Sequence, residues 1–268
     1  MTHTMNPINQ DSDKLTLDRN NPYPGLNAFR ESDDIFFYGR SREADELFRL
    51  VERDVVTVLF GASGLGKTSL LNAGLFPLLR ASGYFPLSVR LNFSDAGISL
   101  AGQVKCVIMD EVKRLEIDAR PSREDETLWE YFHQIHFSDR KNQLLMPVIV
   151  LDQFEEIFTL GSSYPGLSDF IQEMSDLVEN RVPPVVRERL DSGVISELPF
   201  DYEKPAAKVI FSLREDFLAP LEALRDKIPS LGRNRYRLLP MHGEQALEAV
   251  MKPAKPANLV TRSVAEQI

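Results

Sequence analysis

The chain has 268 residues, of which 43% are hydrophobic, enough for the core of one large globular domain or two small ones. Its 31 basic and 40 acidic residues give a formal net charge of −9, which makes the phosphate backbone of a nucleic acid an unfavourable partner. No apolar run reaches the ~18 residues of a membrane span or resembles a signal peptide, and the one cysteine excludes an internal disulfide, so we expect a soluble cytoplasmic protein.

The N-terminal part divides into two stretches. Residues 1–20 are polar and lack periodicity, which predicts a disordered lead-in. From Asn21 the sequence NPYPGLNAF predicts a stiff, extended segment, because each proline fixes its own φ and biases the preceding residue away from helix. We expect Tyr23, Leu26 and Phe29 to hold this segment against the body of the protein.

Apolar periodicity then predicts alternating helices and strands. Ser41 is the expected N-cap of a helix, and VVTVLF at 55–60 is apolar on both faces, as a central parallel strand would be. Further strands are predicted at 85–93, 147–151, 207–213 and 235–239, and further helices after residue 68, at 99–117 and at 126–137. This order predicts an α/β fold with a parallel five-stranded sheet flanked by helices, which binds its ligand at the carboxyl ends of the strands. The proline-rich stretch 181–205 is expected to be an exposed excursion.

A phosphate-binding loop follows the first predicted strand. GASGLGKT, from Gly61 to Thr68, matches G-x-x-x-x-G-K-[ST], in which glycines let the backbone amides turn toward a phosphate at a helix N-terminus. Lys67 would contact the β- and γ-phosphates, and Thr68 would be a ligand of Mg²⁺. The residues expected to hold the nucleotide phosphates are Gly61, Ser63, Gly64, Leu65, Gly66, Lys67, Thr68 and Ser69.

Acidic residues follow the strand PVIVL. Asp152 stands at its tip, where a carboxylate can hold Mg²⁺ directly or through water. Glu155 and Glu156 come within the next turn, and either of them can polarise the water that attacks the γ-phosphate. The sequence does not separate these two candidates for the catalytic base.

An arginine ends the next predicted strand. Arg214 in VIFSLRED has a planar, permanently charged side chain that suits a γ-phosphate, and Asp216 is placed to orient it. The alternative is a surface arginine at the start of an amphipathic helix.

Five motifs in order resemble the STAND class of signal-transduction NTPases, and most closely its bacterial novel STAND group. They are NPYPGL, FFYGR at 36–40, GASGLGKT, LDQFEEIF and SLRED, and the resemblance covers about residues 21–257. It implies an AAA-like NTPase domain in which Tyr38, Gly39 and Arg40 lie near the adenine. It also implies that residues 258–268 begin a linker to a C-terminal region that this chain lacks.

The resemblance implies a slowly hydrolysing ATPase that acts as an ADP/ATP switch. In such a protein the nucleotide, ATP or ADP with Mg²⁺, controls self-association through the NTPase domain, and the sensor and effector regions lie outside this chain. Relatives often serve in antiphage defence. Two other classes stay open: a metabolic P-loop enzyme such as a small-molecule kinase, and a nucleotide-bound interaction scaffold that does not hydrolyse. The preference for ATP over GTP rests on the resemblance alone.

Overall fold

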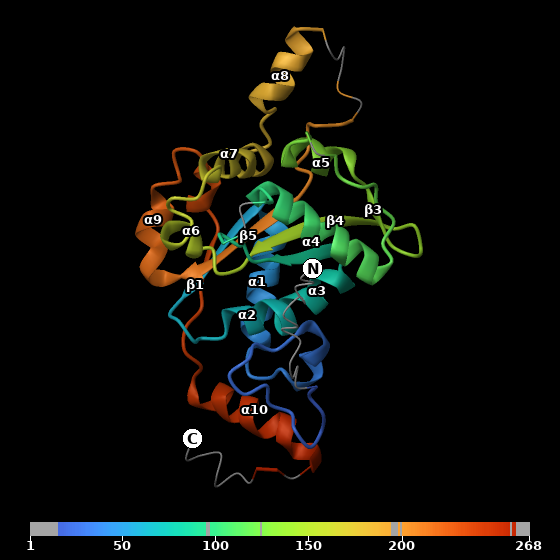
Figure 1. Cartoon of the computed structure of the whole chain (residues 1–268). Helices are drawn as coiled ribbons and strands as arrows, with labels where there is room; N and C mark the ends of the chain where they lie inside the picture. The colour runs from blue at the N-terminus through green and yellow to red at the C-terminus, as the bar shows by residue number, and fades with distance from the viewer. Residues whose placement is uncertain are drawn as a thin grey trace, which may run out of the picture.

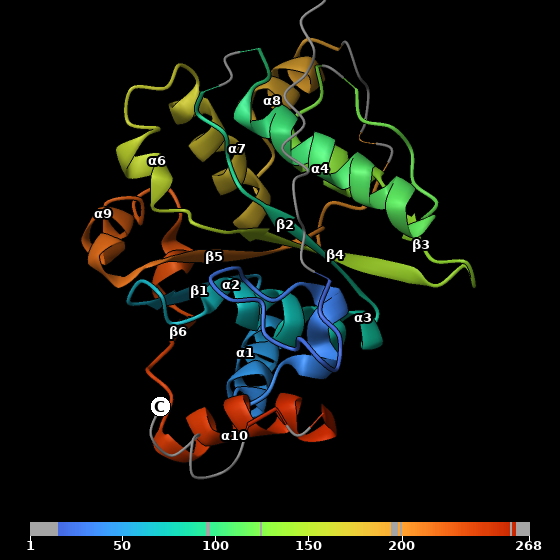
Figure 2. The same cartoon turned by 60° about the horizontal axis from the view of Figure 1, so that its bottom comes forward.

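The computed structural model describes residues 16–94, 97–123, 125–193, 198, 200–257 and 259–260. Figure 1 shows the sheet at the centre of the molecule, where parallel strands run in the order β2-β4-β5-β1-β6, each of them labelled in Figure 2. Their bounds are β1 Val56–Gly61, β2 Tyr84–Val89, β4 Leu144–Leu151, β5 Lys208–Arg214 and β6 Arg235–Arg237. The predicted α/β fold and its five parallel strands are confirmed. A sixth strand, β3 at Phe137–Ser138, pairs antiparallel with β4.

Helices cover both faces of the sheet (Figure 2). One face packs against α1 Ser41–Arg53, α2 Lys67–Ser69, the π-helical turn η2 Leu70–Leu75 and α3 Phe76–Ala81. The opposite face packs against α4 Leu100–Leu115, α5 Leu128–Gln134, α6 Glu156–Thr159, α7 Leu167–Val178 and α9 Leu218–Glu222. The remaining helices are α8 Pro184–Asp191, α10 Gly243–Ala254 and the short 3-10 helices Glu31–Phe36, Glu215–Phe217, Pro229–Gly232 and Lys255–Ala257.

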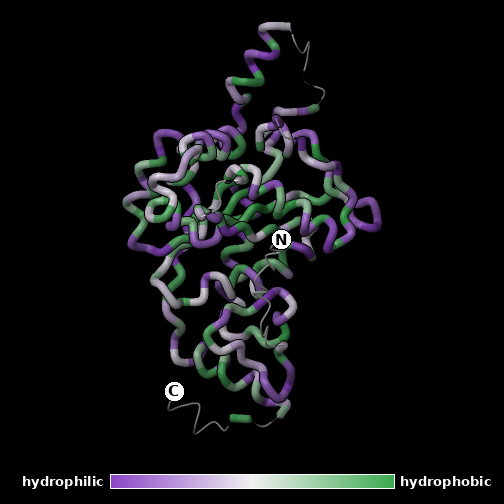
Figure 3. The backbone as a smooth tube through the Cα atoms, viewed as in Figure 1, coloured by the Kyte–Doolittle hydropathy of each residue, from purple (hydrophilic) through white to green (hydrophobic). Residues whose placement is uncertain are grey.

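The strands are apolar on both faces because both faces are covered. In β5, Val209 and Phe211 pack in the core under α4 and α7, whereas Ile210 between them packs under α1 and α3. All three side chains are at most 1% exposed. Figure 3 shows the resulting hydrophobic centre with polar residues on the outer helices. This double burial is the physical reason why the strands could be predicted from uninterrupted apolar runs.

Several predicted boundaries were wrong. Ser41 is the first residue of α1 and not its N-cap, which is Arg40. The helix expected at 126–137 ends at Gln134, because the chain then turns into β3. The stretch 181–205 was predicted as an exposed excursion, and α8 within it does project from the body in Figure 1, but the helix itself was not predicted.

The terminal predictions fall largely outside the described residues. Of the predicted lead-in, residues 1–15 are outside them, and the rest includes a bridge between Asp18 and Asn21. Of the predicted linker, the structure describes residues 259–260 alone. Within the described part of the chain, no helix is long and apolar enough to cross a membrane.

Candidate nucleotide-binding site

The glycine-rich loop joins the carboxyl end of β1 to α2. Gly64 and Gly66 have φ values of 79° and 84°, in the left-handed region that favours glycine. A Cβ at Gly61 would lie 2.6 Å from the carbonyl oxygen of Leu238, so the close approach of the chain after β6 also requires glycine there. The backbone conformation at Gly64 and Gly66 and the close contact at Gly61 thus explain why the motif has glycine at these positions.

Lys67 lies over its own loop. Its Nζ donates to the carbonyl oxygens of Gly61, at 3.1 Å, and Ala62, at 3.2 Å. Burial lowers the pKa of Lys67 from its ordinary value of 10.5, while the nearby carboxylates of Glu155 and Asp152 act in the opposite direction. Neither carbonyl carries a net charge, so an anionic phosphate would be the stronger partner for this ammonium group.

Asp152 connects the loop to the sheet. Its Oδ2 accepts a 2.7 Å hydrogen bond from the Thr68 hydroxyl, and its Oδ1 accepts a 2.8 Å hydrogen bond from Ser212 of β5. The parallel register pairs Leu151 with Phe211, so the residues that follow them, Asp152 and Ser212, lie side by side. Asp152 is only 8% exposed, and both oxygens of its carboxylate accept hydrogen bonds.

The structure separates the two glutamates. The side chain of Glu155 lines the main cavity, and its Oε2 accepts a 3.3 Å hydrogen bond from the Arg214 backbone amide. Glu156 begins α6, is not itself a lining residue, and forms an ion pair with Arg90, which lines the cavity. Gln153 has a φ of 55°, uncommon for a residue with a side chain, in the turn that separates Asp152 from Glu155.

Arg214 ends β5 at the cavity. Its guanidinium group pairs with Asp216 through Nη2, at 2.6 Å, and Nε, at 3.1 Å, as the sequence predicted. It also lies over the ring of Phe217, 5.6 Å from the centroid. The Arg214 side chain is thus exposed to solvent, and its contacts with Asp216 and Phe217 fix the direction of its guanidinium group.

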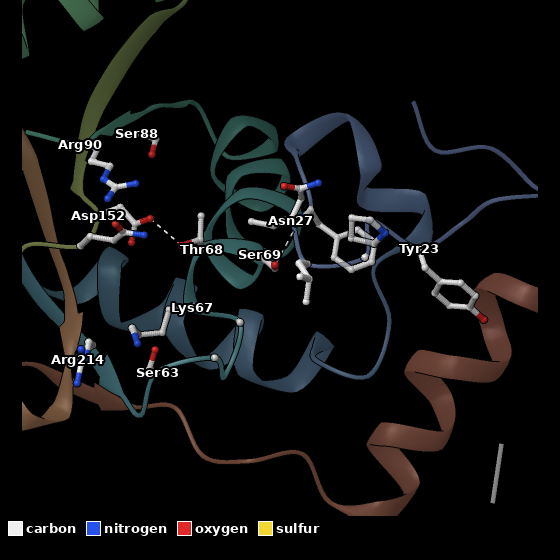
Figure 4. Close-up of a pocket in the computed structure, with 18 of the residues that line it drawn as sticks. Tyr23, Asn27, Ser63, Lys67, Thr68, Ser69, Ser88, Arg90, Asp152 and Arg214 are labelled. Atoms are coloured by element: carbon white, nitrogen blue, oxygen red, sulfur yellow. Dashed lines mark hydrogen bonds between the residues drawn. The ribbon is translucent and has the colours of Figure 1, made fainter. Parts of the chain in front are cut away.

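These residues border one cavity of about 1110 Å³ (Figure 4). Of the residues predicted for the site, those that line it are Ser63, Gly64, Gly66, Lys67, Thr68, Ser69, Asp152, Glu155 and Arg214. Those that do not line it are Tyr38, Gly39, Arg40, Gly61, Leu65 and Glu156. The lining residues that we did not predict are Tyr23–Phe29, Ser88, Arg90, Gln153, Ala249 and Val250. Arg90 directly follows β2, but the strand was predicted to run to residue 93, so the rule that ligands bind at strand ends did not single this residue out.

The segment expected near the adenine has another environment. Arg40 is 3% exposed; it pairs with Glu43 at 2.7 Å and donates to the Leu65 carbonyl oxygen at 3.5 Å. A Cβ at Gly39 would lie 2.4 Å from the Gln245 carbonyl oxygen, so this glycine packs closely against α10. The segment connects the loop and α1 to α10 and stays outside the main cavity.

Residues 23–29, here called the strap, form the wall of the cavity opposite the sheet. The Tyr23 hydroxyl donates to the Val250 carbonyl oxygen of α10 at 2.6 Å, and the Phe29 amide donates to the Ser69 hydroxyl at 3.2 Å. Tyr23 through its side chain and Phe29 through its backbone amide thus anchor the strap, as predicted for these two residues. The prediction for Leu26 was wrong, because its side chain is fully exposed at the tip of a turn.

Comparison with known families identifies the chain. The model of the family described as Novel STAND NTPase 1 matches residues 22–267. The chain belongs to this family. This confirms the family that the sequence motifs predicted. The STAND NTPase is therefore a P-loop protein whose family binds nucleotides. No curated protein matched the sequence.

Several solved structures are similar to this chain over most of its length. A Walker-type ATPase of Pyrococcus abyssi is similar with a TM-score of 0.55 and 14% identity, over 90% of this STAND NTPase and 64% of that chain. Cdc6p of Pyrobaculum aerophilum gives a TM-score of 0.49 and 16% identity over 85% and 53% of the two chains. The ADP form of ORC2 from Aeropyrum pernix gives 0.48 and 14% over 85% and 56%. The STAND NTPase thus spans less than two thirds of each of these chains, and the first match supports a P-loop ATPase fold.

Proposed function

We propose that the protein binds ATP with Mg²⁺, hydrolyses it slowly and uses the ADP and ATP states to control its self-association. The observation that carries this proposal is the convergence of Lys67, Thr68, Asp152, Glu155 and Arg214 on one cavity beside the glycine-rich loop. Each of these side chains comes from the loop or from the carboxyl end of a neighbouring strand. Ligands of doubly wound sheets bind at that edge.

The loop and Lys67 would hold the phosphates. The backbone amides between Gly61 and Thr68 surround the β-phosphate, with Ser69 beside the α-phosphate. Lys67 then exchanges its two carbonyl partners for phosphate oxygens, which form stronger, charge-assisted hydrogen bonds.

The oxygen atoms of Thr68 and Asp152 fit a Mg²⁺ ion. They are 2.7 Å apart, and a hydroxyl with a carboxylate is the hard donor set that Mg²⁺ prefers. Among the described residues no group of three or more His, Cys, Asp or Glu side chains could enclose a metal ion, which suits an ion that shares phosphate oxygens and water. When bound, Mg²⁺ neutralises charge on the phosphates.

Glu155 is the proposed base and Arg214 the proposed sensor of the γ-phosphate. Glu155 borders the cavity and can accept a proton from an attacking water, whereas Glu156 is occupied by Arg90. Because the Arg214 backbone amide donates to Glu155, a shift of the backbone at Arg214 would also move the base. The γ-phosphate and Asp216 would compete for the same guanidinium group.

This competition provides the proposed switch. With ADP, Arg214 stays paired with Asp216; with ATP, it turns to the γ-phosphate and biases the arrangement of the chain. Slow hydrolysis, below about 1 per second, would let the ATP state persist. A role in cytoplasmic antiphage signalling, with sensor and effector regions beyond this chain, is proposed from the family resemblance.

Sedimentation in different nucleotide states tests the switch. We expect a saturating non-hydrolysable ATP analogue to produce a larger species than ADP does, and Arg214→Ala to remove this difference. The matched control is Arg225→Ala, which truncates an exposed arginine paired with Glu222 and outside the cavity. One species in all nucleotide states would favour a scaffold, and phosphate transfer to a small metabolite would favour a kinase.

A further inference from the structure

One charged residue of the cavity lining has no part in the proposed function. Arg90 lines the cavity together with Lys67, Asp152, Glu155 and Arg214. The charges of those four other side chains cancel, since two are cationic and two are anionic. A triphosphate that binds one Mg²⁺ keeps a net negative charge, to which a neutral lining offers no net attraction. Arg90 gives the lining an excess of positive charge.

We propose that Arg90 binds the γ-phosphate of the nucleotide, and that Glu156 is the competing partner that holds Arg90 when no γ-phosphate is present. This inference rests on the proposed function, because it takes Mg²⁺ to be bound at Thr68 and Asp152. Arg90 is then a second arginine, besides Arg214, that distinguishes ATP from ADP.

The sheet places Arg90 beside the proposed metal ligand. Strand β2 pairs with β4 so that Val89 lies next to Leu151, and the Asp152 amide donates to the Val89 carbonyl oxygen at 2.9 Å. Arg90 and Asp152 therefore follow neighbouring strands at the same edge of the sheet. Figure 4 shows Asp152 between Arg90 on one side and Arg214 on the other. A γ-phosphate that shares a metal ion with Asp152 can thus be approached by a guanidinium group from either side.

Arg90 and Lys67 face the same two carboxylates. The hydrogen bond with Glu156 raises the pKa of Arg90, and the charges of Asp152 and Glu155 act in the same direction, although burial opposes them. Burial lowers the pKa of Lys67, and the charges of the same two carboxylates raise it. The proposed metal ion and attacking water lie at Asp152 and Glu155, so the γ-phosphate would lie between Lys67 and Arg90.

The side chain of Arg90 can move while its backbone stays fixed. On one side the backbone is held by the sheet through Val89. On the other side Gln103 of α4 accepts from the Asn92 amide and donates to the Asn92 carbonyl oxygen, both at 2.8 Å. The Arg90 side chain itself is 61% exposed. A change of its rotamer therefore requires no rearrangement of the strand or of the loop that follows it.

The ion pair with Glu156 is one that a phosphate can replace. Glu156 is the first residue of α6 and its side chain is 19% exposed, so it is the less mobile partner. An ion pair with so exposed an arginine contributes little free energy, because water screens it. A phosphate accepts the same fork of guanidinium hydrogens and carries more charge than a carboxylate. Arg90 should therefore leave Glu156 when a γ-phosphate is bound and return to it when only ADP is present.

Binding of ADP and of a non-hydrolysable ATP analogue, measured by calorimetry with Mg²⁺, tests the role of Arg90. The ratio of the two affinities isolates the γ-phosphate. We expect Arg90→Ala to reduce the preference for the analogue about tenfold and to leave ADP affinity unchanged, because one charge-assisted contact is lost. Arg90→Lys keeps the charge without the fork and should reduce the preference about threefold. The control is Arg114→Ala, which truncates an exposed arginine paired with Glu111 outside the cavity and should change neither affinity.

Glu156→Gln tests the competition. Removing the charge of Glu156 weakens its hold on Arg90, so affinity for the ATP analogue should rise about threefold while ADP affinity stays the same. In an Arg90→Ala background the same change should have no effect, because the competitor then has no arginine to hold. The same rise in both backgrounds would overturn the competition.

The remaining outcomes separate this inference from the proposed function. An unchanged preference in Arg90→Ala overturns the role of Arg90 and leaves the proposed function intact. Equal losses for ADP and the analogue also overturn it, because Arg90 would then act on the fold or on phosphates that both ligands share. Failure of the wild-type protein to bind either ligand overturns the proposed function itself. Thermal unfolding without nucleotide confirms that each variant is folded.

Discussion

The two ends of the cavity are built in different ways. The phosphate end combines consecutive residues of one loop with residues at the ends of adjacent strands. The strap end joins segments that are far apart in the chain; the hydrogen bond from Tyr23 to Val250 spans 227 positions. The comparison shows that one binding cavity can have one end encoded by a local motif and the other assembled only by folding. Variants that change ligand binding at one end of the cavity and leave the other unchanged test this division.

The largest effect is expected for the proposed base. Glu155→Gln should reduce ATP hydrolysis about 10²- to 10⁴-fold, because the amide cannot accept a proton, while ATP still binds. Glu156→Gln is the matched change and should cost only a few-fold, since Glu156 pairs with Arg90 and does not itself line the cavity. Phosphate release under single-turnover conditions measures both. A larger loss for Glu156→Gln would reverse the assignment.

The next effect is expected at the phosphate end. Lys67→Ala should weaken the binding of ATP and of inorganic tripolyphosphate, which has the phosphates without the base, alike by about 100-fold, because both ligands lose the same charge-assisted contacts. Calorimetry measures both affinities. Lys227→Ala removes an exposed lysine outside the cavity and should change neither. Retention of either ligand by the Lys67 variant would show that the phosphates bind elsewhere.

A smaller effect follows from the lowered pKa of Lys67. Burial favours the neutral amine, so the free protein loses this proton as pH rises through a pKa below 10.5. Bound phosphates favour the charged amine, so ATP affinity should fall toward alkaline pH, by up to about tenfold per pH unit above that pKa, and binding should take up a proton. Titrations in buffers of different ionisation enthalpy, from about pH 7 to about pH 10, measure both quantities. The same alkaline loss in Lys67→Ala would assign it to another group.

The smallest effect is expected at the far end of the strap. Tyr23→Phe removes the hydrogen bond to the Val250 carbonyl oxygen and should lower the free energy of unfolding by about 1 kcal/mol. The hydrogen bonds of Lys67 and Thr68 do not involve Tyr23, so tripolyphosphate affinity should be unaffected. Denaturant unfolding and calorimetry check the two parts. A loss of tripolyphosphate binding would show that the two ends are coupled.

Sequence patterns predicted the sheet because they depend on short-range physics. Uninterrupted apolar runs revealed β1, β4 and β5, since strands buried on both faces have no polar side to show. Strand β3 was missed because its two residues, Phe137 and Ser138, are too few to form a pattern. Helix α8 was missed for another reason, because the prolines and charges of its stretch indicated an exposed excursion.

By itself, the sequence determined the phosphate loop, the placement of Asp152 and Arg214 at strand ends, and the family. Glycines can adopt the positive φ values that a phosphate-binding loop needs, and residues that follow parallel strands meet at one edge of a sheet. Only the tertiary structure separated Glu155 from Glu156, paired Asp152 with Ser212, and brought the strap rather than Tyr38 to the cavity. Side-chain direction, strand register and the packing of distant segments decided these points, because each depends on contacts between residues that are not neighbours in the chain.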